Sequence, residues 1–346
     1  MKASGEVDVK RESKPEWSEV PAELRDALAE IAGGKIDSGT IAWGGYGPTA
    51  TFVLDVVDGR RLFCKGTHPG ITEEGNEAFH TELAHYQRIP ELAQFGPAFR
   101  GAAHHEDWHL MMLDFVQRTR EVPPWSDETV RGAIAMLARF HANPPARAGE
   151  ILPIAEQQTE FMGLYRAQNG WKALERQADR KQFVGLFSEP FAAERWLDAH
   201  LDEFIALEAR AAHIGGPRSW VHHDFRSDNL LFTRSDEPLL VDFPFLAYGP
   251  TLMDVVFFLP SLAGEGGPTP EAGLRLYEES VGHRFDADDT RITVATVAGF
   301  FAARAGQPDI PGLPRLRWVQ KLQLFPCLAW LAALTEIETA PAPKSF

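Results

Sequence analysis

The chain has 346 residues, of which 44% are hydrophobic and 24% charged, the composition of a globular protein with one large core or two smaller ones. Its 34 Lys and Arg residues against 49 Asp and Glu give a formal net charge of −15, which argues against nucleic acid or an anionic membrane as a partner. The same charge is compatible with a cationic substrate. Two distant cysteines predict no disulfide framework, and the lack of a secretory signal or bilayer-spanning segment predicts a cytoplasmic protein.

The N-terminal part of the chain predicts an extension followed by a helix. Residues 1–20 alternate charged residues with Ser and Pro and have no apolar period, so we expect a mobile or loosely docked extension. Pro21 then opens a helical stretch with Leu24, Leu28 and Ile31 on one face.

Three strands are predicted next, over residues 40–43, 49–57 and 60–65. A glycine-rich turn that contains Gly44, Gly45 and Gly47 separates the first two, and the two-residue turn Asp58-Gly59 separates the second from the third. Glycines allow backbone amides to approach phosphate oxygens without a Cβ in the way. Taken alone, this cluster is more typical of an ordinary hairpin loop.

Lys65 ends the third strand, where an unpaired ammonium would be costly to bury. In the helical stretch that follows, Glu82 shares a face with apolar residues three positions before it and one and four positions after it. We therefore expect the Glu82 carboxylate to point inward and pair with Lys65. Three other acidic residues near the start of this helix remain alternatives: Glu73, Glu74 and Glu77.

Strand-like segments cover residues 97–102 and 108–116, and the chain is predominantly helical afterwards. Ser126 is a plausible N-cap for a helix that continues to His141. Residues 155–183 and 190–212 predict two more helices.

The most informative polar stretch runs from His222 to Asn229 and leads into a hairpin whose second strand ends at Asp242. If the hairpin forms, Asn229 and Asp242 lie at the same edge, and two oxygen ligands there suit Mg²⁺. Asp224 would then accept a proton from a substrate hydroxyl, as in kinase-type phosphoryl transfer. A metal-dependent hydrolase built on His222, His223 and Asp224 would need further ligands, which the sequence does not supply.

The pattern His222-x-Asp224-x4-Asn229 followed by Asp242 is similar to the catalytic and metal-binding segments of the aminoglycoside phosphotransferase family, which includes choline kinase-like enzymes. The resemblance extends over about residues 39–335. It implies an α+β, two-lobed, protein-kinase-like fold. Its small lobe, residues 21–116, would hold an antiparallel sheet, and its larger, mostly helical lobe, residues 117–346, the catalytic loop.

The resemblance also implies a role for each candidate residue. Asp224 is the expected general base, His222 fixes the catalytic loop, and Asp254 braces it. The residues expected to bind ATP or GTP are Lys65, Glu82, Gly44, Gly45, Gly47 and, through hinge backbone groups, Asp114 and Val116. The expected Mg²⁺ ligands are Asn229 and Asp242.

Two positions depart from the family pattern: His223 stands where glycine is common, and Phe243 where tryptophan is common. Neither removes a catalytic atom, but His223 would crowd the loop or contact substrate. The expected function is phosphorylation of a hydroxyl on a small molecule such as an aminoglycoside-like antibiotic, an amino alcohol or a sugar. The alternative is a nucleotide-binding regulatory pseudokinase, whose expected mark, loss of catalytic residues, is absent.

Overall fold

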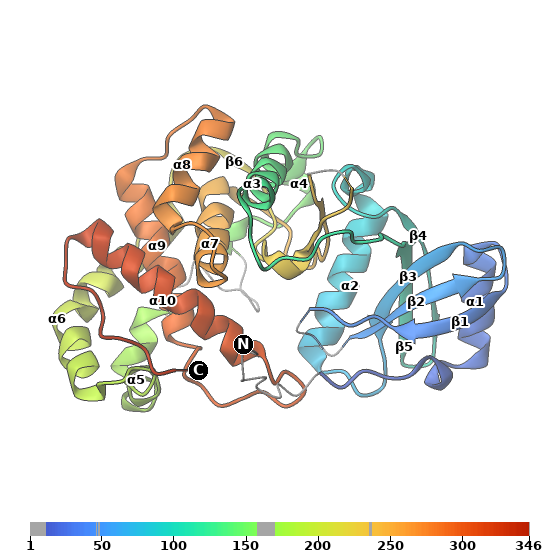
Figure 1. Ribbon diagram of the computed structural model, residues 1–346, viewed down its shortest axis with the longest axis horizontal. Coiled ribbons are helices and arrows are strands. Elements are labelled where there is room, and N and C mark those ends of the chain that lie inside the picture. The colour runs from blue at the N-terminus through green and yellow to red at the C-terminus, as the bar shows by residue number, and fades with distance from the viewer. Residues whose placement is uncertain (1–11, 46, 48, 158–169, 235–236, 346) are drawn as a thin grey trace, which may run out of the picture.

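The computed structural model describes residues 12–345 except 46, 48, 158–169 and 235–236, and these residues form two lobes (Figure 1). The small lobe is a five-stranded antiparallel sheet with strand order β1-β2-β3-β5-β4. Its strands are β1 (Ile36–Ile41), β2 (Ala50–Val56), β3 (Arg61–Thr67), β4 (Phe99–His105) and β5 (Trp108–Asp114). Helix α1 (Ala22–Ala32) packs against the sheet, and α2 (Glu73–Arg88) lies between the sheet and the large lobe.

Local sequence accounts for the register of the central strands. Gly59, with a φ of 88°, closes the tight turn between β2 and β3, and its N–H donates to the Val56 carbonyl at 2.8 Å. This turn pairs Thr51 with Lys65. Because directly paired residues of antiparallel strands point to the same face, both side chains face the large lobe with Glu82.

The large lobe is mainly helical. Its helices are α3 (Asp127–Ala142), α4 (Ala148–Ile151), α5 (Gln177–Val184), α6 (Pro190–Glu208), α7 (Thr251–Gly264), α8 (Pro270–Val281), α9 (Ala287–Ala302) and α10 (Leu316–Thr335). Two small antiparallel sheets pair β6 (Arg218–Val221) with β9 (Ala247–Pro250), and β7 (Leu230–Leu231) with β8 (Leu239–Leu240). The α+β fold with a small antiparallel-sheet lobe and a larger helical lobe is therefore confirmed.

One helix prediction needs correction. Within residues 155–183, the described parts form two short 3₁₀ helices, Ala155–Gln157 and Trp171–Glu175, and then α5, instead of one long helix. Gly170 immediately precedes the second of these, and Glu208 is so close that a Cβ at Gly170 would meet its carboxylate. None of the helices in the described part of the chain is long and apolar enough to cross a membrane.

Two hydrophobic clusters form the core. The smaller one joins α1 to one face of the small-lobe sheet, and the larger one fills the large lobe and continues beneath α2 through Phe79 and Tyr86. Helix α7 is buried over nearly its whole length and contacts both α9 and α10. The catalytic loop predicted from the sequence therefore packs against a helix that is almost entirely buried.

The N-terminal segment differs from its prediction. Residues 12–20 are packed against the small lobe: Val20 is buried, and the Trp17 ring lies edge-on to Phe52 with centroids 5.2 Å apart. Gly39 of β1 allows this approach, because a Cβ there would lie 2.5 Å from the Trp17 ring. The prediction of a mobile or loosely docked extension is therefore wrong for residues 12–20. Single apolar residues such as Trp17 and Val20 hold this segment in place, although it has no apolar period. Residues 1–11 lie outside the described residues.

Candidate active site

Lys65 lies at the centre of the candidate site, between the two lobes. Its Nζ is 2.7 Å from Glu82 Oε2 and also pairs with the Asp242 carboxylate. Burial alone would disfavour the ammonium, but Asp242 and Glu82 raise the pKa of Lys65 above its ordinary value. The predicted Lys65–Glu82 ion pair is present. Glu82 also accepts the Phe243 N–H at 3.2 Å, which ties α2 to the segment after β8.

A buried carboxylate holds the start of the predicted catalytic loop, residues 222–229. Asp254, in the first turn of α7, accepts the backbone N–H of His222 at 2.5 Å and of His223 at 2.6 Å. The His141 Nε2 lies 3.2 Å from Asp254, and Tyr277 holds the other His141 nitrogen at 2.7 Å. Burial raises the pKa of Asp254, but its hydrogen bond and electrostatic interaction with His141, together with smaller contributions from His223 and His222, lower the pKa below its ordinary value.

The two loop histidines are structural elements of the loop. His222 accepts the Asp224 N–H at its Nδ1 (3.2 Å), so its Nε2 carries the proton that it donates to the Val241 carbonyl (3.1 Å). Burial lowers the pKa of His222 to about 4, which keeps the ring neutral. This bond links the catalytic loop to the residue before Asp242.

His223 has a φ of 62° and is fully buried. A residue without a Cβ adopts this left-handed conformation at lower cost, which gives a physical reason for glycine at the position. The His223 Nδ1 lies 3.1 Å from the Phe245 carbonyl, inside the large lobe. Of the two expectations for His223, crowding of the loop or contact with substrate, its buried side chain excludes the second.

Asp224 is held in place by two neighbours in the loop. Arg226 forms an ion pair with the Asp224 carboxylate: its Nη2 donates to Oδ2 at 3.1 Å, and its Nε lies 2.9 Å from Oδ1. The Asn229 Nδ2 donates to the same Oδ2 at 3.2 Å. Burial raises the pKa of Asp224 to about 7, although Arg226 opposes the rise. A carboxylate with a pKa near neutrality suits a general base.

Sequence reasoning missed Arg226. The sequence contains a signal that could have identified it: Arg226 is a cation two residues after Asp224, in a loop otherwise rich in oxygen acceptors. Its Nη2 also lies 3.3 Å from Asp228 Oδ2, so one guanidinium orients two carboxylates.

The β7–β8 hairpin brings the two predicted metal ligands to one edge. The Val241 N–H donates to the Asn229 carbonyl at 3.0 Å, and Asp242 follows with a φ of 71°. The Asn229 Nδ2 donates to the Asp224 carbonyl at 2.8 Å, so its side-chain oxygen is the atom suited to a cation. One amide oxygen and one carboxylate fit Mg²⁺, which takes its remaining ligands from phosphate and water. The described residues contain no cluster of three His, Cys, Asp or Glu side chains that would form a complete metal cage.

The glycine-rich turn lies at the rim of this site. Gly44 and Gly45 have φ values of 152° and 65°, and the Gly45 carbonyl accepts a hydrogen bond from Arg315 Nη2 at 2.7 Å. Gly47 lies between the undescribed residues 46 and 48. The turn is thereby linked to the large lobe just before α10.

The predicted hinge follows β5. The Asp114 N–H donates to the Ala98 carbonyl at 3.0 Å, and its carboxylate pairs with Arg100 at 2.5 and 2.8 Å. The side chain and the backbone N–H of Asp114 are thus already hydrogen-bonded within the small lobe. Val116 lies in the half-buried segment that leads to the large lobe.

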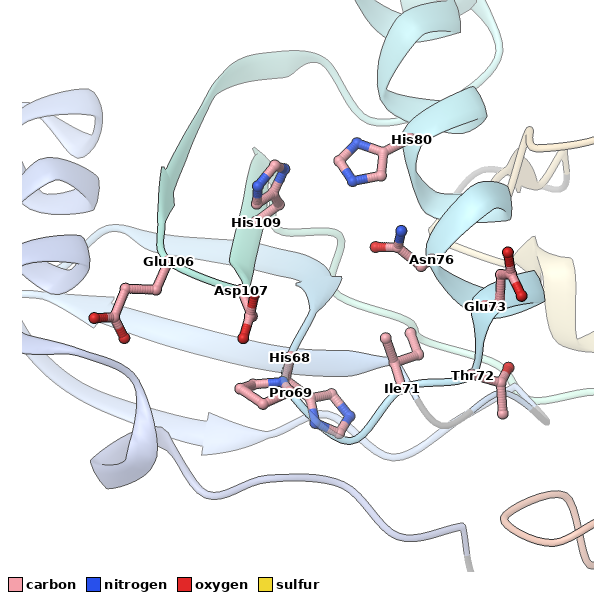
Figure 2. A pocket seen from close by; sticks show the side chains of 10 residues that line it. All are labelled: His68, Pro69, Ile71, Thr72, Glu73, Asn76, His80, Glu106, Asp107 and His109. Carbon is pink, nitrogen blue, oxygen red and sulfur yellow. The ribbon is translucent and has the colours of Figure 1, made fainter.

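A separate polar pocket of about 540 Å³ lies near the start of α2 (Figure 2). Its walls are His68, Pro69, Ile71, Thr72, Glu73, Asn76, His80, Glu106, Asp107 and His109. The His80 and His109 rings meet edge-on with centroids 4.7 Å apart, and burial and neighbouring histidines lower the pKa of His109. None of the predicted site residues lines this pocket.

Known proteins resemble the chain in sequence pattern and fold. The sequence model of the phosphotransferase enzyme family matches residues 39–287. No curated protein sequence matches. The aminoglycoside phosphotransferase of Alicyclobacillus acidocaldarius is 18% identical, with 87% of this chain and 92% of that chain covered and a TM-score of 0.56.

Two more solved structures share the fold. A spectinomycin phosphotransferase in complex with ADP and spectinomycin is 13% identical, covering 87% of this chain and 92% of its own, with a TM-score of 0.53. A putative fructosamine-3-kinase from Thermobifida fusca is 17% identical, covering 87% and 98%, with a TM-score of 0.51. The family match spans most of the chain, and the fold agrees with it: the chain belongs to the phosphotransferase enzyme family and is a small-molecule kinase.

Proposed function

We propose that the protein transfers the γ-phosphate of ATP to a hydroxyl of a small molecule, with Asp224 as the general base and Asn229 and Asp242 as the Mg²⁺ ligands. The observation that carries the proposal is the position of Lys65, which bridges Glu82 of the small lobe and Asp242 beside the catalytic loop. A single cation thereby joins the two halves of a phosphoryl-transfer site.

Each residue has a task that its surroundings support. Lys65 binds the nucleotide phosphates, and Glu82 keeps it oriented towards them. Asp224, gripped by Arg226, accepts the proton of the attacking hydroxyl. When bound, Mg²⁺ supplies positive charge that neutralises the phosphate oxygens. Loose phosphoryl transfer requires mainly such positioning and charge neutralisation from the protein.

ATP is the proposed donor because the Asp114–Val116 segment offers backbone groups in the position of a kinase hinge. The spectinomycin phosphotransferase of similar fold holds ADP, which favours an adenine nucleotide over the GTP that the sequence left open.

The proposed acceptor carries a hydroxyl and a positive charge. Glu265 lies next to the loop, where it accepts hydrogen bonds from Ser227 Oγ at 2.6 Å and Trp125 Nε1 at 2.9 Å. The buried Asp228 Oδ1 has no hydrogen-bond partner among the described residues. These carboxylates beside Asp224, together with a net charge of −15, favour an amine-bearing antibiotic, amino alcohol or amino sugar.

The test is ADP production with ATP and Mg²⁺ across a panel of aminoglycosides, other hydroxyl-bearing antibiotics, amino alcohols and sugars. We expect stimulation by at least one cationic hydroxyl compound. Asp224→Asn removes the proton acceptor and should lower kcat for that compound by about 100-fold or more.

Asp202→Asn provides the matched control, because Asp202 is an exposed carboxylate on α6. The control should retain wild-type turnover. Equal turnover by Asp224→Asn and wild type would overturn the general-base assignment, and stimulation only by neutral sugars would overturn the cationic acceptor.

A further inference from the structure

The packed N-terminal segment brings a lysine into the nucleotide side of the site. The Lys14 Nζ lies 2.6 Å from Thr51 Oγ1 and 3.4 Å from the Ala42 carbonyl. Thr51 is paired with Lys65 across β2 and β3, and Ala42 lies two residues before Gly44, the first glycine of the glycine-rich turn. Lys14 therefore lies on the same face of the sheet as Lys65, at the base of that turn.

The charge of Lys14 is not matched by a carboxylate. Among the described residues it forms no ion pair, and its two hydrogen-bond partners are a hydroxyl and a carbonyl. The carboxylates around it already serve other cations: Glu12 pairs with Arg315 at 2.6 and 2.8 Å, and Asp242 pairs with Lys65. Burial, together with the nearby Lys65, lowers the pKa of Lys14 to about 8. A half-buried ammonium in such surroundings is stabilised by an anion.

The segment is also anchored to both lobes. Glu12 is 2% exposed and holds Arg315 of the large lobe, and the same guanidinium donates to the Gly45 carbonyl. On the small-lobe side, Trp17 packs on Phe52. These contacts hold Lys14 in place before any ligand arrives, which lowers the entropic cost of using it.

We propose that Lys14 is a second phosphate-binding lysine, which contacts the polyphosphate of the nucleotide from the N-terminal segment while Lys65 contacts it from β3. The inference rests on the proposed function, since it takes ATP as the ligand. It assigns a binding residue outside residues 39–287, the part of the chain that the family model matches.

The experiment measures the dissociation constants of ATP, ADP and adenosine by calorimetry in the presence of Mg²⁺, with no acceptor. Lys14→Gln removes the charge but keeps a group that can donate to Thr51, so the fold should be retained. We expect it to weaken ATP and ADP binding about tenfold or more and to leave adenosine binding unchanged. Lys14→Arg keeps the charge and should bind ATP within about threefold of wild type.

Lys35→Gln is the matched control, because Lys35 is an exposed lysine of the small lobe. Unchanged ATP affinity in Lys14→Gln would overturn the inference and leave the proposed function intact. Tighter ATP binding by that variant would overturn it too, because the lysine would then compete for the site. Equal weakening of ATP and adenosine would show a loss of pocket shape instead of a phosphate contact. A wild-type protein that binds no nucleotide would overturn the proposed function itself.

Discussion

At the scale of single residues, the site depends on how each carboxylate is paired. Asp224 is gripped on both oxygens by Arg226, whereas Asp242 and Glu82 share Lys65. A planar guanidinium fixes the orientation of a carboxylate in a way that an ammonium cannot, because its donors form a rigid fork. Orientation of Asp224 is therefore the contribution expected from Arg226.

Replacement of Arg226 tests this orientation. Arg226→Met should lower kcat roughly 10- to 100-fold, because Asp224 loses both charged contacts, and Arg226→Lys should lower it less, because one contact is kept. Steady-state kinetics with the acceptor found in the panel would measure the effect. Arg284→Met, at an exposed arginine of the large lobe, is the control. If the Met and Lys variants lost activity to the same extent, charge would not be what Arg226 contributes.

At the scale of elements, the catalytic loop is held by α7 and α3 acting together. Asp254 at the start of α7 accepts two loop N–H groups, and His141 near the end of α3 lies against the same carboxylate. Removal of a buried acceptor leaves the donors unpaired, which costs more than the net value of the hydrogen bonds. The position of the loop therefore depends on how α3 and α7 pack against each other.

Asp254→Asn retains the shape of the side chain but replaces one acceptor oxygen by a donor nitrogen. The variant should lose about 1–3 kcal/mol in the free energy of unfolding, since one loop N–H faces a donor. It should also lose turnover. Urea denaturation followed by circular dichroism gives the first quantity. A variant as stable as wild type would contradict the bracing role. Asp202→Asn again serves as the exposed control and should leave both quantities unchanged.

At the scale of the whole molecule, a buried carboxylate in the large lobe links stability to pH. Glu208, at the end of α6, is 1% exposed and its Oε2 accepts the Lys172 N–H at 3.5 Å. Burial raises its pKa from the ordinary 4.5 to about 8, although hydrogen bonds from neighbouring amides oppose the rise. Between these two values the folded protein holds a proton that the unfolded chain releases, so the contribution of Glu208 to stability falls as pH rises from about 5 to 8.

Glu208→Gln removes this titration and keeps an acceptor for the Lys172 N–H. The free energy of unfolding of the variant minus that of wild type should increase with pH across this range, with a slope approaching about 1.4 kcal/mol per pH unit. Chemical denaturation at pH 5, 6, 7 and 8 measures the difference directly, and Glu203→Gln, at an exposed position of α6, should show no such slope. A pH-independent difference would mean that Glu208 is charged in the folded protein.

Much of the fold and of the candidate site was predictable from the sequence. Strands β1 to β3, the glycine-rich turn and the β7–β8 hairpin depend on apolar alternation and on turns of a few residues, which a linear sequence displays. The bounds are less local, since β1 covers Ile36–Ile41 instead of the predicted residues 40–43. The spacing from Asp224 to Asn229 and on to Asp242 is also local. Once the β7–β8 hairpin forms, Asn229 and Asp242 necessarily lie at the same edge of it.

Only the tertiary structure decided which charges meet across long separations. The sequence predicted residues 12–20 to be loosely held, yet Trp17 and Glu12 anchor them and place Lys14 beside β2. The spacing of residues along the chain does not predict that the His223 side chain is buried in the large lobe. It does not predict the ion pair between Arg226 and Asp224 either. The physical reason is that the pairing and burial of a charged side chain depend on every element packed around it, whereas strand, turn and loop patterns depend on neighbours along the chain.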